Sequence, residues 1–134
     1  MTKQKEKKLD HVRVIRYLRN WAKHNPFEAS NLGGVTLVFD MDYITRTVAI
    51  RFSICSDKDN FDKALGLSTA VSTIAERILD LDNFRKLADI KGGFLDAYYA
   101  IMQAGIVDGT LSSREKVFLK KIDSDTFFDM RGNT

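Results

Sequence analysis

Four cations near the start of the chain fall on one side of a segment whose apolar residues recur with helical spacing. At 100° per residue they share one arc: Arg13, Arg16, Arg19 and Lys23. Tyr17 and Trp21 lie among the apolar residues close by, and cations beside aromatic rings favour contact with a phosphate backbone or a nucleotide. The alternative interpretation is the solvated face of an amphipathic helix, with both aromatic side chains in the core.

A second group of cations belongs to the segments that follow. Arg51 alternates with apolar residues, so it is expected on the outer face of a strand, and Lys63 follows near the start of a predicted helix. With Arg46 and Lys58, these side chains would extend one anion-binding surface. The candidate ligand-binding residues are therefore Arg13, Arg16, Arg19, Lys23, Arg51 and Lys63.

Residue types that support catalysis or metal binding are sparse. His11 and His24 are 13 residues apart and do not share one turn of a helix, and no CxxC or HExxH sequence is present. The single cysteine, Cys55, excludes an intrachain disulfide and is expected as a small buried residue at the end of a strand. We expect no catalytic residue, no metal site and no cofactor, and hence a protein that is not an enzyme.

The segment 104–115 matches part of a calcium-binding loop. Asp108 and Glu115 occupy matching positions, but Ala104 stands where the first carboxylate ligand belongs. A turn into a helix explains the same residues, because Ser112 and Glu115 have the spacing of a capping box. We therefore predict a capped helix start here.

Two runs of alternating apolar residues predict a β-hairpin at about 35–55, after a loop at 26–34. An isolated hairpin is marginally stable in water, so helices from the basic N-terminal segment (about 9–24) and from the helical C-terminal part (about 59–122) must cover its apolar face. This gives an α+β fold in a single domain, 1–134, with an antiparallel β-hairpin packed against four to five helices. The hairpin has two free edges, where a second copy of the chain can extend the sheet in a homodimer.

Two longer helices are expected in the C-terminal part. Apolar residues recur at helical spacing from Phe61 to Ile78, and Gly66 within this run indicates a close backbone approach or a kink. A second run extends from Phe94 to Ala104, with Gly105 as the residue that ends it.

The positive charge of the chain is concentrated at its start. Residues 1–25 carry eight Lys or Arg against two acidic residues, a net charge of +6, and the remainder carries 13 against 16, a net charge of −3. No apolar run approaches the roughly 20 residues that span a bilayer, and the charged start lacks the apolar stretch of a secretory signal. We expect a cytoplasmic protein without a membrane segment.

The run from Ile50 to Gly66 resembles a pattern in small accessory proteins encoded by phages and prophages. In those proteins a β-hairpin ends at a Cys-containing turn and continues through Asp-x-Phe-x-Lys into a helix with a glycine. The residues that carry the resemblance are Cys55, Asp59, Phe61, Lys63 and Gly66. It implies a phage accessory or counter-defence protein, which would act in the host cell cytoplasm.

Two functions follow as hypotheses. The first is a non-enzymatic protein that binds or sequesters a phosphate-rich ligand, either RNA or a nucleotide, through the candidate cations. The second is a protein–protein inhibitor of a host defence or host machinery component. Its interface would be a free edge of the hairpin or an exposed part of the helix Phe94–Met102.

Overall fold

The computed structural model describes residues 2–32, 35–54 and 63–122, without the side chains of 2–11, 14, 32 and 63. In this part of the chain the helices are α1 (Thr2–His24), α2 (Lys63–Ser72), α3 (Leu81–Lys91), α4 (Phe94–Asp108) and α5 (Ser113–Lys121). The strands are β1 (Phe27–Leu32), β2 (Val35–Asp42), β3 (Thr47–Ile54) and β4 (Arg77–Asp80). The predicted α+β class, a hairpin packed against helices, is confirmed.

The predicted hairpin forms the centre of the sheet. Strands β2 and β3 pair antiparallel in the register that places Leu37 opposite Phe52 and Phe39 opposite Ile50. These four side chains share one face because alternate residues of a strand point the same way, and all four are buried. The prediction of two free hairpin edges is wrong, because β1 pairs with β2 and β4 pairs with β3.

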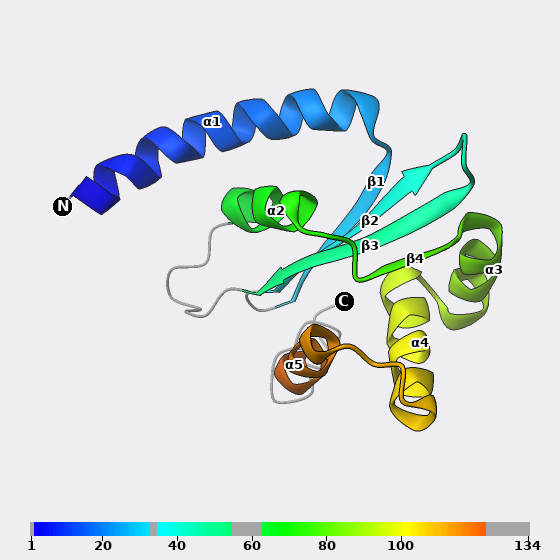
Figure 1. Ribbon diagram of the computed structural model, residues 1–134. Helices are drawn as coiled ribbons and strands as arrows, with labels where there is room; N and C mark the ends of the chain where they lie inside the picture. Colours follow the sequence, from blue (N-terminus) through cyan, green and yellow to red (C-terminus); the bar gives the residue numbers. More distant parts are fainter. Residues whose placement is uncertain (1, 33–34, 55–62, 123–134) are drawn as a thin grey trace.

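Helices cover both faces of this four-stranded sheet. Figure 1 shows α1 and α2 on one side of the sheet and α3, α4 and α5 on the other. The larger core lies on the second side, where Phe39 packs against the rings of Phe84, Phe94 and Tyr98. The smaller core lies on the first side and centres on Val38. The strand β2 is therefore buried from both sides.

The sequence predicts a loop at 26–34, but Phe27–Leu32 form a strand. Every residue of β1 has a partner on β2, from Phe27 opposite Asp40 to Leu32 opposite Val35. The strand lacks a clear alternation of apolar and polar residues because it lies at the edge of the sheet. Its formation depends on pairing with β2, which satisfies the backbone N–H and C=O groups of the strand. A pattern of side chains in the sequence does not predict this pairing.

The helix predicted from Phe61 to Ile78 is shorter in the structure. Phe61 lies outside the described residues, and α2 ends at Ser72. Ser72 donates to the carbonyl of Ser68 and Thr73 to that of Ala70, an arrangement that competes with helical hydrogen bonding. Ile78 instead belongs to β4 and is 67% exposed.

Two helices contain a glycine that lies close to a residue of a neighbouring strand. The hydroxyl of Ser53 donates to the carbonyl of Gly66 at 2.7 Å, so α2 lies close to β3, as Gly66 predicts. Gly105 does not end its helix, because α4 continues to Asp108 and Gly109 takes the left-handed conformation at its end. A Cβ atom on Gly105 would lie 3.1 Å from Nη2 of Arg77, so a larger residue here would require the Arg77 side chain to shift by a few tenths of an ångström.

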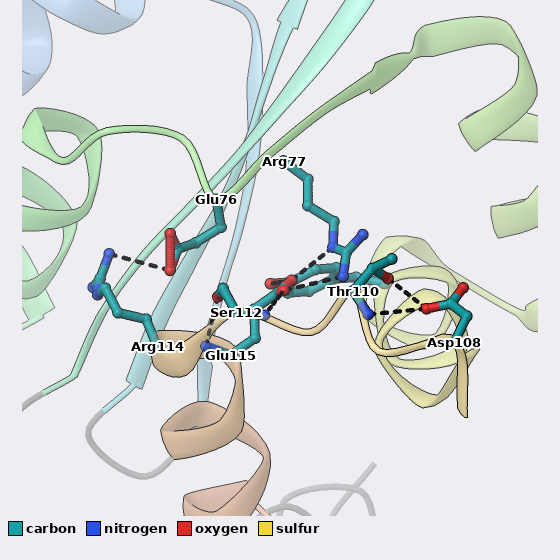
Figure 2. Close-up of polar contacts among 8 residues, drawn as sticks. Glu76, Arg77, Asp108, Thr110, Ser112, Arg114 and Glu115 are labelled. Atoms are coloured by element: carbon teal, nitrogen blue, oxygen red, sulfur yellow. Dashed lines mark hydrogen bonds and ion pairs between the residues drawn. The ribbon is translucent and has the colours of Figure 1, made fainter. Parts of the chain in front are cut away.

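A buried carboxylate joins the helices of the larger core to the edge strand (Figure 2). Ser112 and Glu115 form the predicted capping box at the start of α5. The two oxygens of Glu115 also accept hydrogen bonds from Nε and Nη2 of Arg77 at 2.7 and 3.0 Å, and from the hydroxyl of Tyr98 at 2.7 Å. Glu115 therefore connects α5 to β4 and to α4.

Hydrogen bonds fix the protonation states in this cluster. Burial alone would raise the pKa of Glu115, but the donors Arg77, Tyr98 and the backbone of Ser112 outweigh burial and lower the pKa. Burial, followed by the hydrogen bond to Glu115, raises the pKa of Tyr98 far above its usual value. The ionised glutamate and the neutral tyrosine are thus the stable forms at neutral pH.

We expect the substitution Glu115→Gln to lower the free energy of unfolding by about 3 kcal/mol at neutral pH, because Arg77 loses its buried counter-ion. Since folding lowers the pKa of Glu115, its contribution is complete above the unfolded-state pKa and is lost as the pH falls through the folded-state pKa. The difference between wild type and variant should accordingly shrink in acid. Urea unfolding at neutral and acidic pH measures both effects.

Glu76→Gln is the matched control, since among the described residues Glu76 forms a 3.5 Å ion pair with Arg114 and its Oε1 accepts no hydrogen bond. Equal losses for the two variants, or a difference that does not change with pH, would contradict the role given to Glu115.

Candidate functional site

The exposed face of α1 gathers the four cations that the sequence singles out. All four are solvent-exposed: Arg13, Arg16, Arg19 and Lys23. In the part of the chain that the structure describes, none of them forms an ion pair with a carboxylate. Together with Tyr17 and Asn20 they line a shallow hollow of about 560 Å³. This surface, here called the basic face, therefore presents four exposed positive charges.

The opposite side of α1 fixes the direction of the basic face. Trp21 packs on Phe27 of β1 with ring centroids 4.9 Å apart, and Leu18 packs beside it against the smaller core. The helix ends where the side chain of Asn25 donates to the carbonyl of Trp21 at 2.8 Å, immediately before Pro26. Because the apolar arc of α1 faces the sheet, the cationic arc must face solvent.

Tyr17 differs in exposure from Trp21, the other aromatic residue that the sequence places near the cations. The core interpretation of both aromatic residues holds for Trp21 but not for Tyr17, whose side chain is 43% exposed. Helical geometry explains the difference, since Tyr17 lies at the border between the two arcs and lines the hollow of the basic face. An exposed ring among cations provides a surface on which a nucleic-acid base can stack.

Two arginines of the second predicted group of cations, Arg46 and Arg51, are held by other residues of the fold. A guanidinium N–H of Arg51 donates to the backbone carbonyl of Thr73, and its Nε lies 3.6 Å from Oδ2 of Asp40. Arg46 donates to both carboxylate oxygens of Asp82. Both arginines thus already have a partner within the fold, a backbone carbonyl for Arg51 and a carboxylate for Arg46.

Several predictions concern positions outside the described part, among them that of Lys58 in the anion-binding surface. The side chain of Lys63 is not described, so its place as a ligand-binding residue stays a prediction. Cys55 and Asp59 lie in the segment 55–62, outside the described residues.

A second hollow, of about 460 Å³, lies where the end of α1 meets the turn between β2 and β3. His24 and Asn25 line it from one side, and Asp40 and Arg51 line it from the sheet. Burial raises the pKa of the Asp40 carboxyl, and the nearby charge of Arg51 opposes this rise only in part. The sequence shows that Asp40 is on the polar face of a strand, but not that His24 lies beside it.

The cluster around Glu115 cannot serve as a proton acceptor or a metal ligand. Four donors from Arg77, Tyr98 and Ser112 occupy its two oxygens, which matches the number of lone pairs on a carboxylate. Among the described residues, no group of three or more His, Cys, Asp or Glu lies together as a set of metal ligands would. Each helix in the described ranges is too short or too polar to cross a bilayer.

The interface predicted on the helix Phe94–Met102 is wrong. Every residue of that stretch is buried or partly buried, because α4 packs against the sheet, α3 and the start of α5. Two exposed apolar side chains lie at the edge strand β4 or just before it: Ile74 is 87% exposed and Ile78 is 67% exposed.

Comparisons with protein families, with curated proteins and with solved structures give no match to this chain.

We expect Phe27→Ala to shift the fluorescence emission of Trp21 to longer wavelength, because the indole loses its ring contact and gains water. Trp21 is the single tryptophan of the chain, so the signal has one source. A loss of about 2 kcal/mol in the free energy of unfolding should accompany the shift. Phe94→Ala is the control, since Phe94 packs in the larger core. An unshifted spectrum in Phe27→Ala would contradict the docking of α1.

Proposed function

We propose that this protein is a non-enzymatic, phage-type accessory protein that binds or sequesters RNA through the basic face of α1. The observation that carries the proposal is a set of four exposed cations without carboxylate partners in the described part of the chain. Free guanidinium and ammonium groups bind phosphates and release the counterions that surround nucleic acid. The counter-defence role rests on the resemblance of residues 50–66 alone.

The length of the basic face favours a strand of RNA over a single nucleotide. Arg13 and Lys23 are separated by ten residues of helix, or about 15 Å at 1.5 Å per residue. In a duplex the phosphates of each strand are about 3.4 Å apart along the helix axis, and in an extended strand they are further apart. The four cations can therefore contact the phosphates of successive nucleotides, a reach greater than the short phosphate group of one nucleotide.

A second candidate function, inhibition of a host protein, has one specific observation in its favour. The edge strand β4 carries Ile78 on its exposed side, and Ile74 precedes it. An open strand edge beside exposed apolar side chains is suited to pairing with another chain, either a host protein or a second copy of this one. Binding of this kind would depend little on salt.

Replacing all four cations of the basic face by glutamine should weaken binding to a labelled single-stranded RNA of mixed sequence and flatten its salt dependence. At about 0.7 counterions per phosphate contact, the slope of log affinity against log salt should change by about 3. Fluorescence anisotropy across a salt series measures both quantities.

The matched control replaces four exposed lysines of α3 and α5 by glutamine: Lys86, Lys91, Lys116 and Lys120. This variant has the same net charge as the first but keeps the basic face, so its affinity should stay close to that of the wild type. Equal affinities for the wild type and the variant without the basic face would refute the proposal.

A further inference from the structure

The basic face leads directly into the second hollow. Four exposed residues of α1 form a continuous stripe because they are spaced four, three and four residues apart: Arg13, Tyr17, Asn20 and His24. The first three line the hollow of the basic face, and His24 lines the second hollow. In Figure 1 this end of α1 lies on the same side of the molecule as the turn between β2 and β3. A strand that follows the stripe therefore arrives at the second hollow.

The charges of the second hollow differ from those of the stripe. Asp40 and Asp42 both line it, and the cation beside them, Arg51, is held by Thr73 and lies close to Asp40. Two carboxylates repel a phosphate group. A nucleotide that reaches this hollow must place its phosphate on the cations of α1 and turn its base inward.

We propose that the second hollow binds the base of one nucleotide of the same RNA strand, a guanine, with the carboxylate of Asp40 as its hydrogen-bond acceptor. This inference rests on the proposed binding of RNA to the basic face. In this arrangement the hollow determines which base is bound, and α1 makes the contacts with phosphates that do not depend on sequence.

The carboxylate of Asp40 selects guanine because of the pattern of donors that it can accept. Guanine is the RNA base with two adjacent N–H donors on its Watson–Crick edge, and the two oxygens of a carboxylate accept such a pair. In adenine and cytosine an acceptor nitrogen stands beside the amino group, and in uracil two carbonyls flank the single N–H.

Asp40 has the capacity for this contact. The separation of 3.6 Å between its Oδ2 and Nε of Arg51 exceeds hydrogen-bond distance, and that Nε makes no hydrogen bond in the structure. Asp42, by contrast, already accepts from the backbone N–H groups of Ile44 and Thr45.

The remaining walls fit the flat body of a base. Ala49 and the exposed side chain of Ile78 offer apolar surface along the hollow, while Asn25 and Thr47 add polar groups. The volume of about 460 Å³ falls within the usual range of small-ligand sites, roughly 300 to 1,000 Å³.

The test uses the whole chain and labelled oligouridines that carry one guanosine, one adenosine, one cytidine or no substitution. The wild type should bind the guanosine-containing strand about fivefold or more tightly than the others. Asp40→Asn should abolish this preference, because the amide places a donor against guanine, and should leave the slope of affinity against salt unchanged. Asp89→Asn, at an exposed position of α3, is the control and should keep the preference.

A second variant covers the case in which Asp40→Asn does not fold. Ile78 is exposed, so Ile78→Ser should fold, lose part of the guanosine preference and keep the salt dependence. Equal, salt-dependent affinity of the wild type for all four strands would overturn the guanine site and leave the RNA-binding role intact. Absence of salt-dependent binding to any strand would overturn both.

Discussion

The burial of β2 from both faces is the constraint on which the rest of the structure depends. Five consecutive residues, Val35–Phe39, are buried, so alternate side chains must enter different cores. Phe39 anchors the core that α3, α4 and α5 complete, and Val38 anchors the smaller core beneath α2 and α1. Because α1 buries its apolar arc on the side of the smaller core, the four cations of the basic face are left in solvent. The direction of the basic face thus follows from the two-sided burial of one strand.

Charged side chains in this protein divide into two groups by their partners. The buried carboxylate of Glu115 is fully satisfied within the fold, by Arg77, Tyr98 and Ser112. These contacts hold elements together and leave the carboxylate no capacity for a ligand. The four cations of the basic face form no ion pair with a carboxylate among the described residues and lie at the surface. Asp40 lies between these cases, since its ion pair with Arg51 is longer than a hydrogen bond.

The sequence predicts those elements that carry their own local signal. In the β2–β3 hairpin apolar residues occupy every alternate position, α1 has a two-sided helical pattern, and the start of α5 has a capping box between Ser112 and Glu115. The edge strands β1 and β4 are missed because they are short and depend on pairing with neighbours. Ile78 shows the problem clearly, since its spacing fits a helix while its backbone belongs to a strand.

The candidate site is predicted in part for the same reason. The cationic arc is a property of one helix and can be read from spacing, whereas the partner of Arg51 at Thr73 is set by tertiary contacts. The second hollow combines residues from α1, the hairpin and β4, and no local pattern connects them.

The most direct test of the central claim is an NMR titration that follows backbone amide shifts of the whole chain as single-stranded RNA is added. The account predicts that the largest changes fall on residues 13–24 and decrease as salt is raised. Changes centred on β4 and insensitive to salt, or no changes along α1, would contradict it.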